Sequence, residues 1–334
     1  MRSLTLWGYQ RMRLSITSDI CAICGEDFES QKKLLHHIRF KEKLSQQKYF
    51  TEHFPRYDLY SADLIDFKNL EQYKTARFNR RDHISRLAKK SGDEDFQKWR
   101  RELFVDLLKE RVERKNLSVA PCDVELRTIM MPSVSDYDRV FDSGYWEACQ
   151  RAEINPRFKY YSPDLPFDIP MSKEIKGVMT ICVDTREQKP LSFGPSVNTR
   201  SLALDWADYI PEKPYFANVV VERKSLPDFV NTMSGGIERF KKEIERANAV
   251  GLYVVVVVES PLYKAKQYRG RFSQAKGAHI MHRMRSVLAQ FNNVQFLFVR
   301  NREEAQEIIP RVFLLKADAK KLDLQYLYRN GSFS

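Results

Sequence analysis

The sequence has no apolar run long enough to cross a bilayer, since its hydrophobic residues are interrupted throughout. A transmembrane helix needs about 20 mostly apolar residues in a row. We therefore expect no membrane partner. The 5 cysteines lack the paired spacing of a secreted disulfide scaffold. With both classes excluded, we expect a cytoplasmic protein, in the host-cell cytosol if it is viral and in the nucleus if it is eukaryotic.

Acidic residues are missing from one long interval, Ser260 to Arg302. The chain carries a net charge of +12, which favours an anionic partner, DNA first. Basic side chains neutralise phosphates, and the interleaved Tyr263, Tyr268 and Phe272 suit stacking on unpaired bases. A solvated basic loop is the alternative. The residues we assign to nucleic-acid binding are Lys264, Lys266, Arg269, Arg271, Lys276, Arg283 and Arg285.

Patterning divides the 334 residues into four parts. Residues 1–55 contain a zinc-finger-like region, and residues 56–175 form a mainly helical, DNA-contacting region that ends in a linker. Residues 176–316 alternate strands with helices, and residues 317–334 form a C-terminal tail. The strands and helices that we expect in the third part are Val178–Asp184, Ala203–Ile210, Val219–Lys224, Ile237–Ala249, Leu252–Glu259, Phe296–Val299 and Glu303–Leu315. This alternation predicts an α/β fold.

The first part contains Cys21-x2-Cys24, followed by Phe28, Leu34 and His37. The spacing resembles a zinc finger of the two-cysteine, two-histidine class, in which two cysteines on a knuckle and a helical histidine hold a structural Zn²⁺. Phe28 and Leu34 would form its small core. The usual second histidine, three to five residues later, is missing. His53 is the best substitute as fourth ligand, with His36 behind it; a reduced cysteine pair without metal is the alternative.

Three acidic residues lie in or at the end of strands expected in the third part. Asp184 ends the first, Asp208 lies near the end of the second, ahead of the third, and Glu222 lies two residues before Lys224 at the end of a valine run. Because a strand alternates its faces, Glu222 and Lys224 point the same way and Arg223 points the other way. Carboxylates beside an ammonium can hold Mg²⁺ or Mn²⁺ and direct a water at a phosphodiester.

The order Asp…Glu-x-Lys resembles the PD-(D/E)XK nucleases. More specifically, Val183–Glu187, Asp208–Tyr209 and Glu222–Asp228 resemble the XPF-type nuclease signature Val-Asp-x-Arg-Glu, Gly-Asp-Tyr and Glu-Arg-Lys-x3-Asp. The resemblance implies a restriction-endonuclease-like fold and a metal-dependent endonuclease. Asp208, Glu222 and Asp184 would be the Mg²⁺ ligands. The resemblance further implies catalytic roles for Asp184, Asp208, Glu222, Lys224, Arg186, Glu187 and Asp228.

Several of these residues also have structural interpretations. Arg186 would contact the phosphate or form an ion pair with Glu187 or Asp208. Asp228 fits a capping box begun by Ser225. Arg223 is expected to pair with a carboxylate behind the sheet. The family's Gly before the Asp is Ala207 here, which is unstrained only where φ is negative, so this departure concerns the local turn.

Two classes of function fit these observations. The first is a structure-selective DNA endonuclease that acts in repair or recombination, with a site-specific, homing-type endonuclease as a variant. The second is a non-catalytic nucleic-acid-binding accessory protein. A single active site cuts one strand, so a double-strand break would require a homodimer or two successive cuts.

Overall fold

The computed structural model describes residues 20–53, 87–89, 91–129, 131–159, 168–269 and 276–333. These residues belong to two compact units, Met1–Ser91 and Gly92–Ser334. Within the described ranges, no helix has the length and apolar character needed to cross a membrane.

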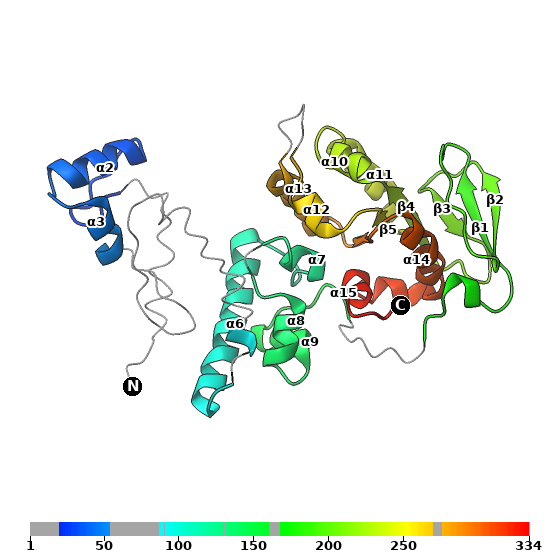
Figure 1. Cartoon of the computed structure of the whole chain (residues 1–334), viewed down its shortest axis with the longest axis horizontal. Helices are drawn as coiled ribbons and strands as arrows, with labels where there is room; N and C mark the ends of the chain where they lie inside the picture. Colours follow the sequence, from blue (N-terminus) through cyan, green and yellow to red (C-terminus); the bar gives the residue numbers. More distant parts are fainter. Residues whose placement is uncertain are drawn as a thin grey trace. The chain divides into compact units, whose positions relative to one another are not determined.

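A single sheet organises the second unit (Figure 1). Its six strands are β1 Met179–Asp184, β2 Val197–Leu202, β3 Tyr209–Pro211, β4 Val219–Lys224, β5 Tyr253–Val258 and β6 Val294–Phe298. Their order is β2-β1-β3-β4-β5-β6. The last three run parallel, whereas β3 is antiparallel to both β1 and β4. The predicted mixed α/β fold is confirmed.

The two faces of the sheet are covered by different helices, as alternation along β6 shows. Phe296 and Phe298 contact Phe229 of α10 (Leu226–Met233). Phe296 also contacts α11 (Ile237–Ala249). Gln295 points the opposite way and bonds Ala319 and the backbone N–H that begins α15 (Leu324–Arg329). Successive strand residues face opposite sides, so α10 and α11 cover one face and α15 covers the other.

One predicted strand differs from the structure. Where one strand was expected over Ala203–Ile210, the structure has only the short strand β3, which begins at Tyr209. A further strand, β2, precedes it in the chain and lies at the edge of the sheet. Strand β2 escaped prediction because its side chains after Val197 are exposed and mostly polar. Without alternation between apolar and polar residues, an edge strand has no periodic signal.

Helices fill the rest of the second unit (Figure 1). Their bounds are α6 Glu94–Lys115, α7 Asp123–Leu126, α8 Val134–Val140, α9 Gly144–Ala152, α12 Leu262–Lys266, α13 Gly277–Gln290 and α14 Arg302–Leu314. Short 3-10 turns lie at Ser172–Glu174 and Lys316–Lys320. Asp93 caps α6 by accepting a hydrogen bond from the Phe96 N–H at 2.9 Å. Arg157 joins this helical part to the sheet by donating to the Leu288, Phe291 and Val294 carbonyls.

A buried carboxyl pair also links the helical part to the end of the chain. Asp323 accepts a hydrogen bond from the Asp123 backbone N–H at 2.8 Å and another from the Tyr326 N–H at 3.1 Å. Both carboxyls are almost fully buried. Burial and the nearby Asp123 charge raise the pKa of Asp323 to about 7.

This raised pKa predicts a pH dependence of stability. Between an unfolded pKa of about 3.9 and the folded value of about 7, the folded state holds a proton that the unfolded state releases. Stability is therefore lost as pH rises through this window. We expect urea unfolding free energies to fall by about 2 kcal/mol more in the wild type than in Asp323→Asn between about pH 5.5 and 7.5. Equal pH slopes for the two proteins would contradict the prediction.

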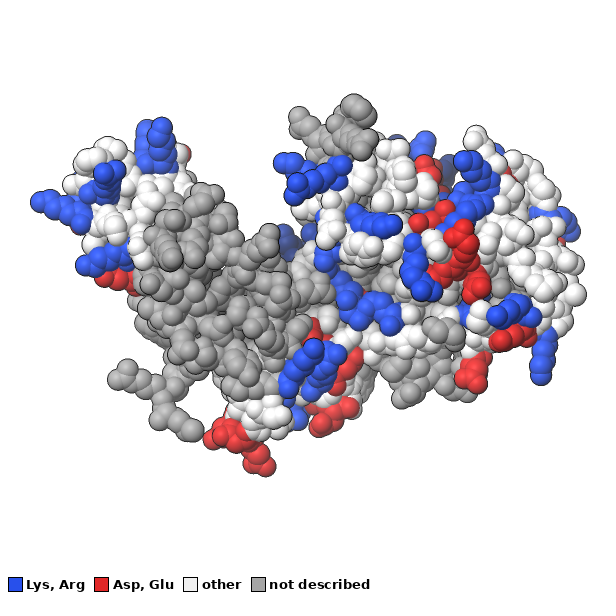
Figure 2. Space-filling model, viewed as in Figure 1, with Lys and Arg blue, Asp and Glu red and all other residues white. Residues whose placement is uncertain are grey.

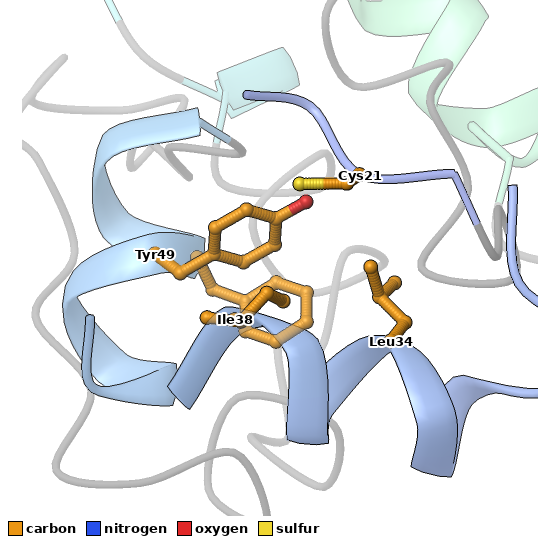
Figure 3. Packing of buried hydrophobic residues seen from close by; sticks show 5 residues of the cluster. Cys21, Leu34, Ile38 and Tyr49 are labelled. Carbon is orange, nitrogen blue, oxygen red and sulfur yellow. The ribbon is translucent and has the colours of Figure 1, made fainter. Parts of the chain in front are cut away.

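The described part of the first unit contains a small helical fold. Helix α2 spans Gln31–Phe40 and α3 spans Gln46–His53. Cys21, Leu34, Ile38, Tyr49 and Phe50 pack together between them (Figure 3). The predicted core residue Leu34 is buried, and Phe28 packs against this cluster.

Candidate active site

Three carboxylates form a row across the centre of the sheet. The register aligns Val183 of β1 with Tyr209 of β3, and Tyr209 with Val221 of β4. One residue further, the Asp184 N–H donates to the Asp208 carbonyl at 3.0 Å, and the Asp208 N–H donates to the Val221 carbonyl at 3.1 Å. The residues next in register are therefore Asp184, Asp208 and Glu222. Neighbours in register share a face, so these three residues, distant in sequence, lie side by side on one face of the sheet.

Glu222 and Lys224 lie on the same face, as predicted from their spacing. Lys224 Nζ is 2.9 Å from Glu222 Oε1, and it also lies 5.4 Å from the centre of the Phe240 ring on α11. The pair is therefore on the side of the sheet that α10 and α11 cover. An ammonium held here is in place to stabilise negative charge that develops on a phosphate.

Asp208 lies in an electrostatically unfavourable place for a carboxylate. Burial and the neighbouring Glu222 charge raise its pKa to about 7, although its side chain accepts a hydrogen bond from the Arg223 backbone N–H at 2.7 Å. Two carboxylates close together resist simultaneous ionisation. A divalent cation would relieve this repulsion, which makes Asp208 and Glu222 a suitable pair of oxygen ligands.

Asp184 is held differently from the other two. Its carboxylate receives the Arg186 side chain, with Nε at 2.9 Å from Oδ2, and the Arg186 backbone N–H at 3.0 Å from Oδ1. Burial alone would raise the pKa of Asp184, but these hydrogen bonds lower it. Arg186 thus pairs with Asp184 rather than with the predicted Glu187 or Asp208. Among the described residues, the three carboxylates do not form a group with ligand atoms all within 4.8 Å.

Arg223 points to the other face of the sheet, as predicted. Its guanidinium is 3.0 Å from Glu187 Oε1 and 3.0 Å from Glu259 Oε1. Glu259 also meets Arg302 of α14 at 3.3 Å. Glu187, a candidate catalytic residue, therefore holds the neighbourhood of Asp208 in place through Arg223. Sequence reasoning missed Glu259 and Arg302 because their pairing joins distant segments.

An open cleft of about 1020 Å³ borders the site. Asp208, Glu222 and Lys224 line it together with α10 and the start of α11, and residues 186–189 and Arg223 also line it. Asp228 also faces this cleft, and it accepts a hydrogen bond from Ser225 Oγ at 2.5 Å while Ser225 caps α10. Ser225 caps the helix as expected, but Asp228 accepts from the Ser225 hydroxyl and not from its backbone N–H, so only half of the predicted capping box forms. Asp228 therefore holds the cap in place at the rim of the cleft. Cleft residues not foreseen from sequence are Asn231, Thr232 and Arg239.

The turn before Asp208 differs from the expectation. Ala207 has φ +58°, so the negative φ that would make alanine a strain-free replacement for glycine is absent. A left-handed conformation costs an L-residue about 1–2 kcal/mol. The turn persists because Asp208 is hydrogen-bonded through its backbone to strands on both sides.

Replacing this alanine by glycine is expected to stabilise the protein. Ala207→Gly removes the left-handed strain and adds unfolded-state entropy, leaving a net gain of about 0.5–1 kcal/mol in the free energy of unfolding. As a matched control, Ala289→Gly on the exposed side of α13 should lose about 0.5–1 kcal/mol. Urea denaturation measures both. Destabilisation by Ala207→Gly would rule out strain at this turn.

The basic residues assigned to nucleic acid lie on or near α12 and α13, where Lys and Arg side chains gather in Figure 2. Lys264, Lys266, Arg269 and Lys276 are exposed, and Arg271 lies outside the described residues. Three of the set make protein contacts: Lys266 with the Arg127 carbonyl, Arg283 with the Ser234 carbonyl, and Arg285 with Thr128. These contacts give the three residues a structural role that the sequence did not indicate.

The cysteine and histidine residues of the first unit meet as predicted, except at one position. Cys21, Cys24, His37 and Glu42 place ligand atoms within 4.8 Å of one another. The expected fourth ligand, His53, is outside this group. Its ring lies against Tyr49, with ring centres 5.2 Å apart, because α3 packs that side chain on the core. Glu42 follows His37 by five residues, which is within the spacing expected for the second histidine of a finger. The prediction considered only histidines as the fourth ligand and therefore did not include Glu42.

Residues 183–312 match the model of the ERCC4 domain family. The chain contains an ERCC4 domain. This XPF-type nuclease domain of PD-(D/E)XK type includes all three carboxylates of the row, Lys224 and the cleft. It confirms the restriction-endonuclease-like fold that the signature residues predicted.

Similar solved structures include two of XPF from Aeropyrum pernix. The one described as a complex with DNA is 19% identical with a TM-score of 0.33, and the match covers 42% of this chain and 66% of that chain. The other is 17% identical with a TM-score of 0.32, covering 41% and 63%. This chain thus spans less than two thirds of either structure. No curated protein matches it.

Proposed function

We propose that the ERCC4 domain is a metal-dependent DNA endonuclease that hydrolyses phosphodiester bonds and selects branched or flapped DNA. The observation that carries the proposal is the row of Asp184, Asp208 and Glu222, of which the last two line an open cleft together with Lys224. A binding protein has no need of this charged set, which its own repulsion makes unfavourable. Repair or recombination of DNA is the setting that suits such a substrate.

Each residue of the site has its own proposed role. Asp208 and Glu222 would hold Mg²⁺ or Mn²⁺ with Asp184 beside them, and the ion supplies a polarised water and relief of phosphate charge. Lys224 orients that water or stabilises the phosphorane. Arg186, with a side chain 71% exposed, is available to exchange Asp184 for a phosphate. Glu187 acts through Arg223, and Asp228 shapes the rim of the cleft.

DNA binding would extend from this cleft to the exposed basic residues of α12 and α13. Lys264, Arg269 and Lys276 are in position to contact phosphates without giving up a described protein contact. In the first unit, we propose that Cys21, Cys24 and His37 hold a structural Zn²⁺. A homodimer is proposed where both strands are cut.

A panel of labelled flaps, junctions and linear duplexes tests the proposal with Mg²⁺, Mn²⁺ or EDTA. We expect metal-dependent products from the branched substrates. Retarded bands without products, on every substrate and with every ion, would instead support a non-catalytic accessory protein. One defined cleavage position in a long linear DNA would support a site-specific, homing-type endonuclease.

A further inference from the structure

One histidine nitrogen in the first unit faces two potential ligand atoms. His37 Nε2 lies 3.3 Å from Cys24 Sγ and 3.0 Å from Glu42 Oε1. A neutral imidazole nitrogen carries either one proton or one lone pair, so it cannot form a full hydrogen bond to both. Ligand atoms around a tetrahedral Zn²⁺ are roughly 3.3–3.8 Å apart, given bonds of about 2.0–2.3 Å. The Nε2–Sγ spacing of 3.3 Å lies within this range, and the Nε2–Oε1 spacing of 3.0 Å is slightly below it. All four ligand atoms lie within 4.8 Å of one another, close enough to surround one ion after small side-chain shifts.

The end of α2 brings Glu42 to this position. Lys43 adopts φ +54°, and the Leu44 N–H bonds back to the Ile38 carbonyl at 3.1 Å. The left-handed Lys43 and this backbone hydrogen bond reverse the chain after the helix. The reversal returns the Glu42 side chain to His37, whose ring its carboxylate contacts. Glu42 therefore occupies the place in sequence and in space where a finger carries its second histidine.

The other ligands are fixed by contacts around them. The Cys21 N–H bonds the Glu26 carbonyl at 2.8 Å, and the Gly25 N–H bonds the Cys21 carbonyl at 2.8 Å, which forms the knuckle. On the far side of the imidazole, His37 Nδ1 lies 3.6 Å from Glu26 Oε2. A carboxylate on the second ring nitrogen orients a metal-bound histidine and raises its basicity.

The side chains that meet here are of the kinds that bind Zn²⁺. Two cysteines, the Glu42 carboxylate and the His37 ring lie together, and His37 is the one ion-pair partner of Glu42 within the described residues. The core below them is a cluster of few side chains around Ile38 (Figure 3). Cys21 and Cys24 form no disulfide, so both sulfur atoms can act as metal ligands.

We propose that Glu42 is the fourth ligand of a Zn²⁺ ion bound by Cys21, Cys24 and His37. The proposal rests on the proposed Zn²⁺ site and names its missing ligand. His53 is left as a packing residue on Tyr49. The site is thus a finger with two cysteines, one histidine and one glutamate, in which the thiolate and imidazole ligands suited to Zn²⁺ are joined by one oxygen ligand.

Titration of the full chain with Co²⁺, followed by competition with Zn²⁺, tests this assignment. The thiolate-to-cobalt absorption band reports only a cysteine-ligated ion, so binding at the nuclease carboxylates does not interfere. We expect Glu42→Gln to weaken Co²⁺ affinity by at least about 10-fold and to change the visible spectrum. His53→Gln should change neither. Glu42→His, which completes a set of two cysteines and two histidines, should restore tight binding with a shifted spectrum.

The outcomes separate the two proposals. A wild-type chain that gives no thiolate-to-cobalt band would overturn the Zn²⁺ site as a whole. A wild-type band that is retained in Glu42→Gln but weakened in His53→Gln would overturn Glu42 alone. Tight Co²⁺ binding by Glu42→His would show that the protein folds with residue 42 substituted. Weak binding by Glu42→Gln would then report the loss of a ligand and not a failure to fold.

Discussion

Glu222→Gln is expected to lower the Mg²⁺-dependent cleavage rate by at least about 10³-fold, equivalent to about 4 kcal/mol of transition-state stabilisation. The amide keeps the length of the side chain on β4 and removes the negative charge that would hold the ion. It also leaves Lys224 without its ion-pair partner at 2.9 Å, so the charge balance around the water changes. Single-turnover cleavage of a labelled flap measures the effect.

DNA affinity should fall little in the same variant, because removing a negative charge does not weaken phosphate contacts. The matched control is Glu238→Gln on α11, whose side chain is 78% exposed and does not line the cleft. It is expected to cut at the wild-type rate. Equal cleavage by Glu222→Gln and the wild type would remove Glu222 from the catalytic set.

The row of carboxylates shows what local pattern can predict. Strand β4 begins and ends at the expected residues, and period-two alternation places Glu222 with Lys224 and Arg223 on the opposite face. These predictions needed only the apolar run and the geometry of one strand. The resemblance of the signature residues predicted the nuclease fold, which alternation alone does not give.

Contacts between distant segments explain what the sequence did not predict. The Arg186 side chain had several carboxylates within sequence reach, and only the fold selects Asp184. Ala207 is left-handed because neighbouring strands fix Asp208, which no local propensity indicates. Glu42 returns to His37 through a turn with Lys43 at positive φ, although lysine gives no turn signal. In each case tertiary structure overrides the local preference.

Arg223→Ala is expected to cause the largest loss of stability, about 3 kcal/mol or more. The Arg223 side chain is 11% exposed, and its partners Glu187 and Glu259 are 8% and 9% exposed. These two carboxylates raise the pKa of Arg223 well above its usual range despite its burial. Removing the guanidinium leaves both carboxylates buried with incomplete compensation, since Arg302 reaches only Glu259.

Thermal unfolding should show a Tm lower by roughly 6–12 °C, at 2–4 °C per kcal/mol for a unit of this size. The matched control is Arg200→Ala, another arginine paired with a glutamate on the sheet but 60% exposed. An exposed pair contributes about 0–1 kcal/mol, so its Tm should move little. Adding Glu187→Gln and Glu259→Gln to Arg223→Ala should recover part of the loss, because the uncompensated charges are then gone. Similar Tm changes for Arg223→Ala and Arg200→Ala would show that the ion pairs of Arg223 with Glu187 and Glu259 do not stabilise this unit more than an exposed pair does.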